Sequence, residues 1–159
     1  MGVSGSGKTL IGSGFARALG VDFVEGDDYH PAENVERMAA GIALTDSDRA
    51  AWLHSLADRL RGANAARTGL VMSCSALKKS YRDVLRSGAR ELQFVFLRGD
   101  RALLTERIAS RRGHFMPPSL LDSQLSTLEE PSPDESAWVC DIRESPEELI
   151  AALVARAVA

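Results

Sequence analysis

The feature that most constrains this chain stands at its start, where Gly2-Val3-Ser4-Gly5-Ser6-Gly7-Lys8-Thr9 fits the pattern G-x-x-x-x-G-K-[ST] at every fixed position. The pattern predicts a phosphate-binding loop, because glycines let the backbone curl until successive N–H groups point at one anion. We expect the whole segment to bind the phosphates of a nucleotide, with Lys8 on the β- and γ-phosphates and the Thr9 hydroxyl on Mg²⁺. The alternative is a flexible Gly/Ser-rich terminus. It is disfavoured because apolar residues follow at helical spacing: Ile11, Phe15, Ala18 and Leu19.

A buried β-strand normally precedes a phosphate-binding loop, yet Met1 stands directly before this one. In a doubly wound sheet that strand is central. We therefore expect the first strand to be missing from this chain, with the natural start upstream and Met1 an internal methionine that ends the strand. Sequencing the N-terminus of the intact protein tests this expectation.

Composition excludes several classes of function. The 159 residues, 45% hydrophobic and 26% charged, are typical of one globular domain spanning 1–159. A net charge of −3 without a Lys/Arg cluster disfavours nucleic acid as a partner. No run of 18 apolar residues and no signal peptide are present, so we expect no membrane partner and a cytoplasmic location. Cys74 and Cys140 lie near the ends of apolar runs, which favours reduced core thiols over a disulfide or zinc site.

Helical and strand patterns alternate along the chain, which predicts an α/β fold with a parallel sheet between layers of crossover helices. Ligands of such sheets bind at the carboxyl ends of the strands. We interpret 129–136 as a surface loop and Asp46 as a helix cap. The expected helices are about 8–19, 31–40, 46–66, 79–86, 101–111, 118–128 and from 145 onward, and the expected strands are 21–24, 70–74, 92–97 and 137–142.

Acidic residues follow the strand expected at 21–24. Glu25 and Asp27 would face the phosphate loop, where one carboxylate can hold a metal and the other can orient an attacking hydroxyl group. We expect Glu25 near Mg²⁺ and Asp27 on the substrate hydroxyl, the alternative being a turn rich in Asp and Gly. His30 is a weaker candidate for substrate contact, because a lone histidine is more often structural.

Two basic residues are candidates for an anionic group of the substrate. Arg49 can present its guanidinium fork to a carboxylate, or can be an ordinary solvated charge on a helix. Lys78 follows a strand end rich in small hydroxyl residues and can line a polar pocket. Arg82, one turn further on, is at least as well explained as a surface charge.

A basic segment has the pattern of a lid over roughly 111–130. Arg107 and Arg111 are four residues apart and so share one helix face. We expect one of them to stack on adenine and the other to neutralise charge on the transferring phosphoryl group, with Gly113 as a hinge. An ordinary basic helix end is the alternative.

Taken together, the spaced motifs resemble the gluconate kinases (gluconokinases), small P-loop kinases related in fold to shikimate and adenylate kinases. Two familiar P-loop classes fit less well, because no Asn-Lys-x-Asp element of GTPases and no apolar run ending in Asp-Glu is present. The resemblance spans Gly2 to about Ile142 and rests on Gly26-Asp27-x-x-His30-Pro31-x-x-Asn34, Met38-x-x-Gly41-x-x-Leu44-x-Asp46-x-Asp48-Arg49-x-x-Trp52-Leu53, Cys74-Ser75-Ala76-Leu77-Lys78-Lys79-x-Tyr81-Arg82-Asp83, Gly113-His114-Phe115-Met116-Pro117 and Leu121-x-Ser123-Gln124-Leu125.

The resemblance implies ATP-dependent phosphorylation of D-gluconate at its 6-hydroxyl group with Mg²⁺, a homodimer, and substrate contact by His114. Ala43 and Ala51 depart from prolines that are usual in the family, and neither residue does chemistry. The alternatives are a shikimate-type or other small-molecule P-loop kinase, and an N-terminally truncated nucleotide-binding protein without activity.

Overall fold

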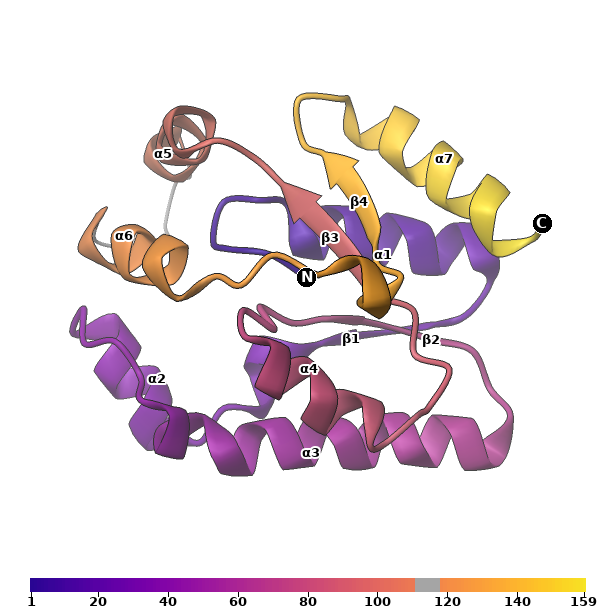
Figure 1. Ribbon diagram of the computed structural model, residues 1–159, viewed down its shortest axis with the longest axis horizontal. Coiled ribbons are helices and arrows are strands. Elements are labelled where there is room, and N and C mark those ends of the chain that lie inside the picture. The colour runs from indigo at the N-terminus through magenta and orange to yellow at the C-terminus, as the bar shows by residue number, and fades with distance from the viewer. Residues whose placement is uncertain (111–117) are drawn as a thin grey trace.

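The structure is a computed structural model that describes residues 1–110 and 118–159, and Figure 1 shows the arrangement of its elements. None of the helices in this described part is both long and apolar enough to span a membrane. The helices are α1 (Lys8–Leu19), α2 (Ala32–Ala39), α3 (Asp46–Ala66), α4 (Lys79–Arg86), α5 (Arg101–Ser110), α6 (Pro118–Thr127) and α7 (Pro146–Ala157). The strands are β1 (Asp22–Glu25), β2 (Leu70–Ser73), β3 (Val95–Arg98) and β4 (Trp138–Asp141), and two 3-10 turns are η1 (Gly26–Tyr29) and η2 (Pro133–Glu135).

The strands form two parallel pairs. β1 pairs with β2, and β3 pairs with β4. The first residues of the chain lie between the two pairs, as the position of the N-terminus in Figure 1 shows. The Met1 amino group donates to the Val95 carbonyl at 2.5 Å, and the Met1 carbonyl accepts from the Leu97 amide at 2.9 Å. On the other side, the Gly2 amide donates to the Ser75 carbonyl at 3.2 Å. Met1 and Gly2 therefore connect the two halves of the sheet.

Helices cover both faces of these strands, which confirms the predicted three-layer α/β fold. α1 and α7 lie side by side on one face, and α3 and α4 lie on the other (Figure 1). Within β2, Val71 packs toward the first helix layer, whereas Leu70 and Met72 pack toward the second. Alternate side chains of a strand point to opposite faces. A parallel strand with helices on both faces can therefore bury apolar side chains at successive positions.

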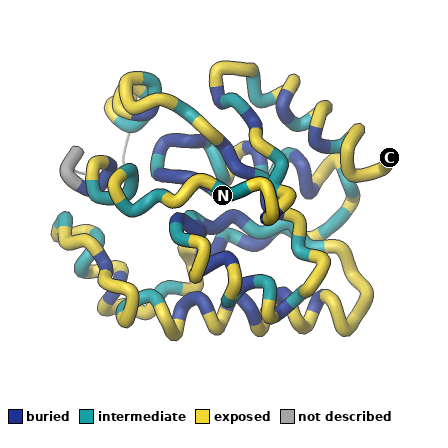
Figure 2. Tube along the Cα trace, in the orientation of Figure 1, coloured by how far each residue is buried: buried dark blue, intermediate teal, exposed yellow. Residues whose placement is uncertain are grey.

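Two apolar cores result, one on each side of the strands. Figure 2 shows the buried residues along the strands and the inward faces of the helices. On the α3 side the core centres on Trp52 and Leu56, and on the α1 side on Leu104 and Leu153. Both cysteines are free and buried, as predicted. Burial raises the pKa of the Cys74 thiol to about 12, so that thiol is un-ionised at neutral pH.

Most element boundaries fall within a few residues of the predictions, with two corrections. Thr45, and not Asp46, is the N-cap of α3: its side chain accepts from the Asp48 amide, and the Asp48 carboxylate accepts from the Thr45 amide. A reciprocal pair of this kind satisfies two amide groups at once. β3 starts at Val95 rather than at 92, because the Leu92 amide donates to the Ala89 carbonyl and so closes a turn.

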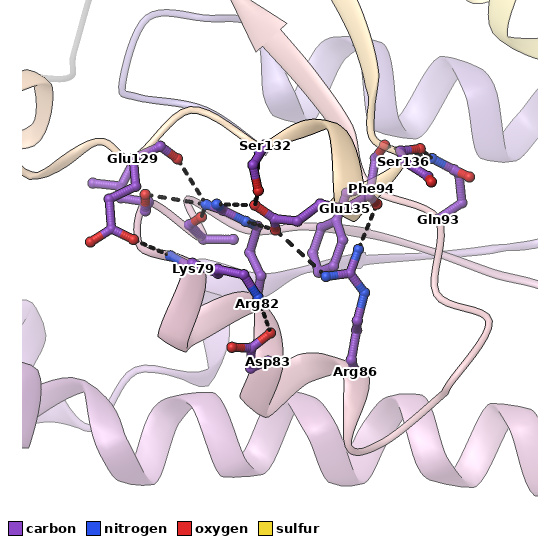
Figure 3. Close-up of polar contacts among 12 residues, drawn as sticks. Lys79, Arg82, Asp83, Arg86, Gln93, Phe94, Glu129, Ser132, Glu135 and Ser136 are labelled. Atoms are coloured by element: carbon purple, nitrogen blue, oxygen red, sulfur yellow. Dashed lines mark hydrogen bonds and ion pairs between the residues drawn. The ribbon is translucent and has the colours of Figure 1, made fainter.

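The segment 129–136 is a loop on the surface, as expected, but its Glu135 is buried, and Arg82 is a buried residue rather than a surface charge. Figure 3 shows the two regions joined by an ion pair between Arg82 and Glu135, whose side chains are 0% and 1% exposed. The Arg82 guanidinium donates to both Glu135 oxygens, at 2.5 and 2.7 Å, and also to the Glu129 carbonyl at 3.0 Å. The pattern of Pro, Glu and Ser indicated a loop correctly, but a local pattern carries no sign of a buried partner 53 residues away.

Candidate nucleotide and substrate site

The phosphate-binding loop has the backbone that its glycines predict. Gly5 and Gly7 adopt left-handed φ angles of 81° and 90°, which turn the chain into the first residues of α1. Ser6 is buried, and its hydroxyl group donates to the Val3 carbonyl at 2.8 Å, which stabilises the turn of the loop backbone. The loop therefore presents backbone N–H groups beside the positive end of a helix, an arrangement that favours a bound phosphate.

Two further contacts hold the loop. The Ser4 amide donates to the side-chain carbonyl of Gln124 on α6, at 2.7 Å. The Lys8 amino group donates to the Val3 carbonyl at 3.2 Å, so its charge lies against the loop. Sequence reasoning placed Gln124 in a family motif without a role, because a partner 120 residues away is invisible to local patterns.

The loop meets the carboxyl end of β1 through Glu25, as predicted. The Thr9 hydroxyl donates to Glu25 Oε2 at 2.6 Å. Ser73, at the end of β2, donates to the other carboxylate oxygen, Glu25 Oε1. Gly26 permits this approach, because a Cβ atom there would lie 2.2 Å from the Ser73 carbonyl oxygen. The donor set of hydroxyl and carboxylate oxygens is the type that Mg²⁺ prefers, although the described residues contain no cluster of three or more His, Cys, Asp or Glu side chains.

Asp27 and His30 follow on η1 and just after it. Asp27 is exposed, and its backbone carbonyl accepts from the His30 amide at 3.2 Å. The His30 ring stacks on Trp52 with ring centroids 4.1 Å apart. The Trp52 indole is itself fixed, since it donates to the Gly26 carbonyl at 2.7 Å. The backbone of η1 and the indole thus set the position of the imidazole.

The His30 imidazole has an unused polar atom. Its Nδ1 is buried and has no hydrogen-bond partner among residues 1–110 and 118–159. Burial lowers the pKa of His30, a shift that Asp27 opposes and Arg49 reinforces. A buried nitrogen without a partner is costly, so this atom is a suitable contact for a ligand hydroxyl group.

The predicted cations Arg49 and Lys78 meet around one aromatic ring. The Arg49 guanidinium lies 5.8 Å from the centroid of the Tyr81 ring, and the Lys78 ammonium 5.6 Å. Asp46 accepts from two of these residues: Lys78 donates to both of its carboxylate oxygens at 2.8 Å, and the Tyr81 hydroxyl donates to one at 2.5 Å. These hydrogen bonds, that of Lys78 first, lower the pKa of Asp46. Asp46 is thus a partner of the cations, a role that its expected place as a cap concealed.

The arginine predicted to contact ATP from α5 is held at the end of β4. The guanidinium of Arg107 donates to the Ile142 carbonyl at 2.6 Å. Stacking of an arginine on adenine stays a prediction. Arg111, Gly113 and His114 lie outside the described residues, as does the first part, 111–117, of the predicted lid at 111–130.

A family model described as an AAA domain matches residues 1–131, a range that includes every residue of the predicted site. The chain is 51% identical over 135 residues to the gluconokinase of Gluconobacter oxydans (strain 621H), covering 85% of this chain and 76% of that protein. It is 49% identical over 136 residues to the thermosensitive gluconokinase of Escherichia coli (strain K12), covering 85% and 72%. A solved structure of a gluconokinase from Sinorhizobium meliloti 1021 has a TM-score of 0.89 and 47% identity, covering 99% of this chain and 90% of that one.

Proposed function

Because the chain belongs to the gluconokinase family of P-loop proteins, we propose that it transfers the γ-phosphoryl group of ATP to the 6-hydroxyl group of D-gluconate, giving 6-phospho-D-gluconate and ADP. The observation that carries the proposal is the hydrogen bond from Thr9 to Glu25. It joins the phosphate loop to the strand end from which Asp27 and His30 follow, so a donor site and an acceptor site adjoin. Phosphoryl transfer needs positioning and charge neutralisation more than covalent help.

The loop supplies the donor side. Its backbone N–H groups and the ammonium of Lys8 would hold the phosphates, and their positive charge favours the charge that develops on the transferring group. Thr9 and Glu25 are the residues that would hold Mg²⁺, directly or through its water. When bound, Mg²⁺ supplies neutralising charge at the β- and γ-phosphates.

The acceptor side lies around η1. The exposed Asp27 carboxylate would orient the 6-hydroxyl group and accept its proton as the bond to phosphorus forms. His30 Nδ1, which is buried and has no partner among the described residues, would bind a second hydroxyl group of the sugar chain. Gluconate offers such groups along its length, so both contacts fit one substrate.

The cations around Tyr81 suit the other end of the substrate. Arg49 and Lys78 carry two positive charges against the one negative charge of Asp46, which leaves one in excess. One carboxylate would balance it, and gluconate carries one carboxylate. We assign both cations to this group, with Arg49 better suited to a bidentate contact because its guanidinium is a planar fork.

The lid residues complete the proposal. Arg107 and Arg111 would contact ATP, one on adenine and one on the transferring phosphoryl group, and His114 would contact gluconate. The family resemblance further supports one kinase domain over 1–159, a homodimer and a cytoplasmic location. Sedimentation velocity of the purified protein tests the dimer.

The deciding experiment is ADP release with Mg-ATP and a panel of gluconate, shikimate, glucose and AMP. We expect turnover with gluconate alone, at roughly 1–100 s⁻¹, which is ordinary for a kinase. Turnover with shikimate instead would favour the shikimate-type alternative. The non-catalytic alternative predicts no ADP with any acceptor but a higher melting midpoint in Mg-ATP, since binding stabilises the native state.

A variant in the phosphate-binding loop distinguishes turnover by this protein from turnover by a contaminating kinase. Lys8→Ala should lower kcat by orders of magnitude, because it removes the charge nearest the phosphates. Lys79→Ala is the matched control, since Lys79 pairs with Asp83 on α4, outside the proposed site. Equal turnover of the two variants would refute the assignment of the loop.

A further inference from the structure

Ser73 is a buried hydroxyl residue at the carboxyl end of β2, and only 3% of it is exposed. Helices cover both faces of the strands (Figure 1), and strand positions of this kind are ordinarily apolar. Burying a hydroxyl group is costly unless the group is hydrogen-bonded. Ser73 lies too deep to line a pocket for the substrate, so we looked for its role among its partners inside the protein.

Two neighbouring residues fix the direction of the Ser73 hydroxyl group. It donates to Glu25 Oε1, and its oxygen accepts from the Gly26 amide at 3.4 Å. The hydroxyl group thus uses its donor and one of its acceptor sites on two successive residues of the chain. Because 3.4 Å is long for a hydrogen bond and a carboxylate is a strong acceptor, the bond to Glu25 is the stronger of the two.

The sheet brings Glu25 and Ser73 together. The two residues are partners in the parallel ladder of β1 and β2, so their side chains stand next to each other on one face of the sheet. They form the last pair of that ladder, at the carboxyl edge where Glu25 also meets Thr9 of the phosphate-binding loop. The contact is therefore specified by the register of two strands.

Glu25 needs such support because its side chain is long. It is only partly buried, and a glutamate loses much rotamer freedom when it is fixed in one orientation. Its Oε2 accepts from the Thr9 hydroxyl at 2.6 Å, and its Oε1 accepts from Ser73. A carboxylate has about four acceptor sites, so both oxygens keep a lone pair for a metal ion or its water.

We propose that Ser73 is a positioning residue for the metal: its hydrogen bond fixes the Glu25 carboxylate in the orientation in which Glu25 and Thr9 would hold Mg²⁺. The role rests on the proposed function, because it presupposes a metal–nucleotide complex on the phosphate-binding loop. Ser73 acts through Glu25 and does not itself contact the metal or the sugar. Partners that orient a metal-binding side chain typically contribute about 10–100-fold to metal affinity.

Binding of ADP with and without Mg²⁺ tests this role without any turnover. Isothermal titration calorimetry gives the Kd for ADP in EDTA and in excess Mg²⁺. Ser73→Ala should weaken binding of Mg-ADP roughly tenfold and leave binding of ADP in EDTA unchanged. Ser73→Cys keeps the buried volume but has only a weak S–H donor, so it should show the same loss. Ser73→Thr keeps the hydroxyl group and should bind Mg-ADP as tightly as the unaltered chain.

Cys74→Ala is the matched control. Cys74 is the next residue and is also buried, but it packs in the core on the α3 side. This variant therefore loses a buried group without changing the partner of Glu25, and both dissociation constants should equal those of the unaltered chain. A loss of Mg-ADP binding as large as in Ser73→Ala would overturn the proposal, because general destabilisation of the strand end would explain both.

A double-mutant cycle shows whether Ser73 acts through Glu25. Glu25→Gln removes the carboxylate, and in that background Ser73→Ala should weaken Mg-ADP binding no further. Additive losses would overturn the proposal. So would equal Mg-ADP affinity of Ser73→Ala and the unaltered chain, where the unaltered chain binds Mg-ADP more tightly than ADP. If the unaltered chain gains nothing from Mg²⁺, the metal role of Glu25 falls together with that of Ser73, whereas turnover with gluconate tests the choice of substrate separately.

Discussion

Asp27 and Asp28 are neighbouring exposed carboxylates on η1, and the proposed function distinguishes them. Asp27→Asn keeps the size of the side chain but removes the proton acceptor. We expect kcat for gluconate phosphorylation to fall roughly 10²–10⁴-fold, the usual contribution of a general base, with a smaller rise in KM. Asp28→Asn is the matched control and should leave both constants nearly unchanged. The reverse pattern for Asp27, a raised KM with normal kcat, would make it a binding residue only.

His30 combines two functions that one substitution separates. Its ring stacks on Trp52, while its Nδ1 has no hydrogen-bond partner in the part of the chain that the structure describes. His30→Phe retains an aromatic ring on Trp52 and removes the nitrogen. We expect KM for gluconate to rise roughly tenfold, the worth of one hydrogen bond of about 1.4 kcal/mol, with little change in melting midpoint. His54→Phe serves as control, because His54 is exposed on α3. An unchanged KM with a lowered midpoint would make His30 purely structural.

The ion pair between α4 and η2 is sensitive to substitution, because both of its charges are buried. Glu135→Gln removes the negative partner and leaves the Arg82 guanidinium buried. Breaking a buried pair from one side typically costs 3–5 kcal/mol, so the free energy of unfolding should fall by about 3 kcal/mol in urea titrations. Glu130→Gln is the control, since Glu130 is exposed and 3.9 Å from Arg98. Equal stability of the two variants would contradict the structural role.

The same pair gives a dependence on pH. Hydrogen bonding from Arg82 lowers the pKa of Glu135 from 4.5 to about 2. The unfolded chain therefore binds the proton first as the pH falls. The contribution of the pair is complete above about pH 4.5 and is lost as the pH falls toward 2. In Glu135→Gln this part of the acid dependence should be missing, which unfolding measured between pH 5 and 2 will test.

The helices that the sequence predicted best are those whose signals are local. α3 and α4 have the predicted bounds, because apolar spacing within each helix specifies its buried face. The phosphate loop and its contact with Glu25 were also predictable, since strand ends of a parallel sheet share one edge. The pairing of Asp46 with Lys78 and of Arg82 with Glu135 was not. Each joins residues 32 or 53 positions apart, and no periodic pattern encodes such a partner.

For the protein as a whole, the connection between its two strand pairs runs through Met1. The Met1 amino group donates to Val95 in the interior. Burial is the first cause that lowers the pKa of this group from 8.0 to about 5, with Lys8 acting in the same direction and the thiols of Cys74 and Cys140 opposing it. In a chain that begins at Met1, folding therefore buries an amine that loses its proton more readily than it does in the unfolded chain.

The sign of the resulting pH effect follows from proton binding. Between pH 5 and 8 the unfolded chain holds a proton on this amine that the folded chain does not, so the free energy of unfolding rises with pH. Three pKa units set an upper limit of about 4 kcal/mol for the rise. Acetylation of the Met1 nitrogen removes the titration. Urea unfolding of the free and acetylated proteins at pH 5, 6.5 and 8 should therefore give a slope for the free amine alone. Other groups, His30 among them, cancel in this comparison. Parallel curves for the two proteins would mean that the amine is solvated, and that the two halves of the sheet are held by other contacts.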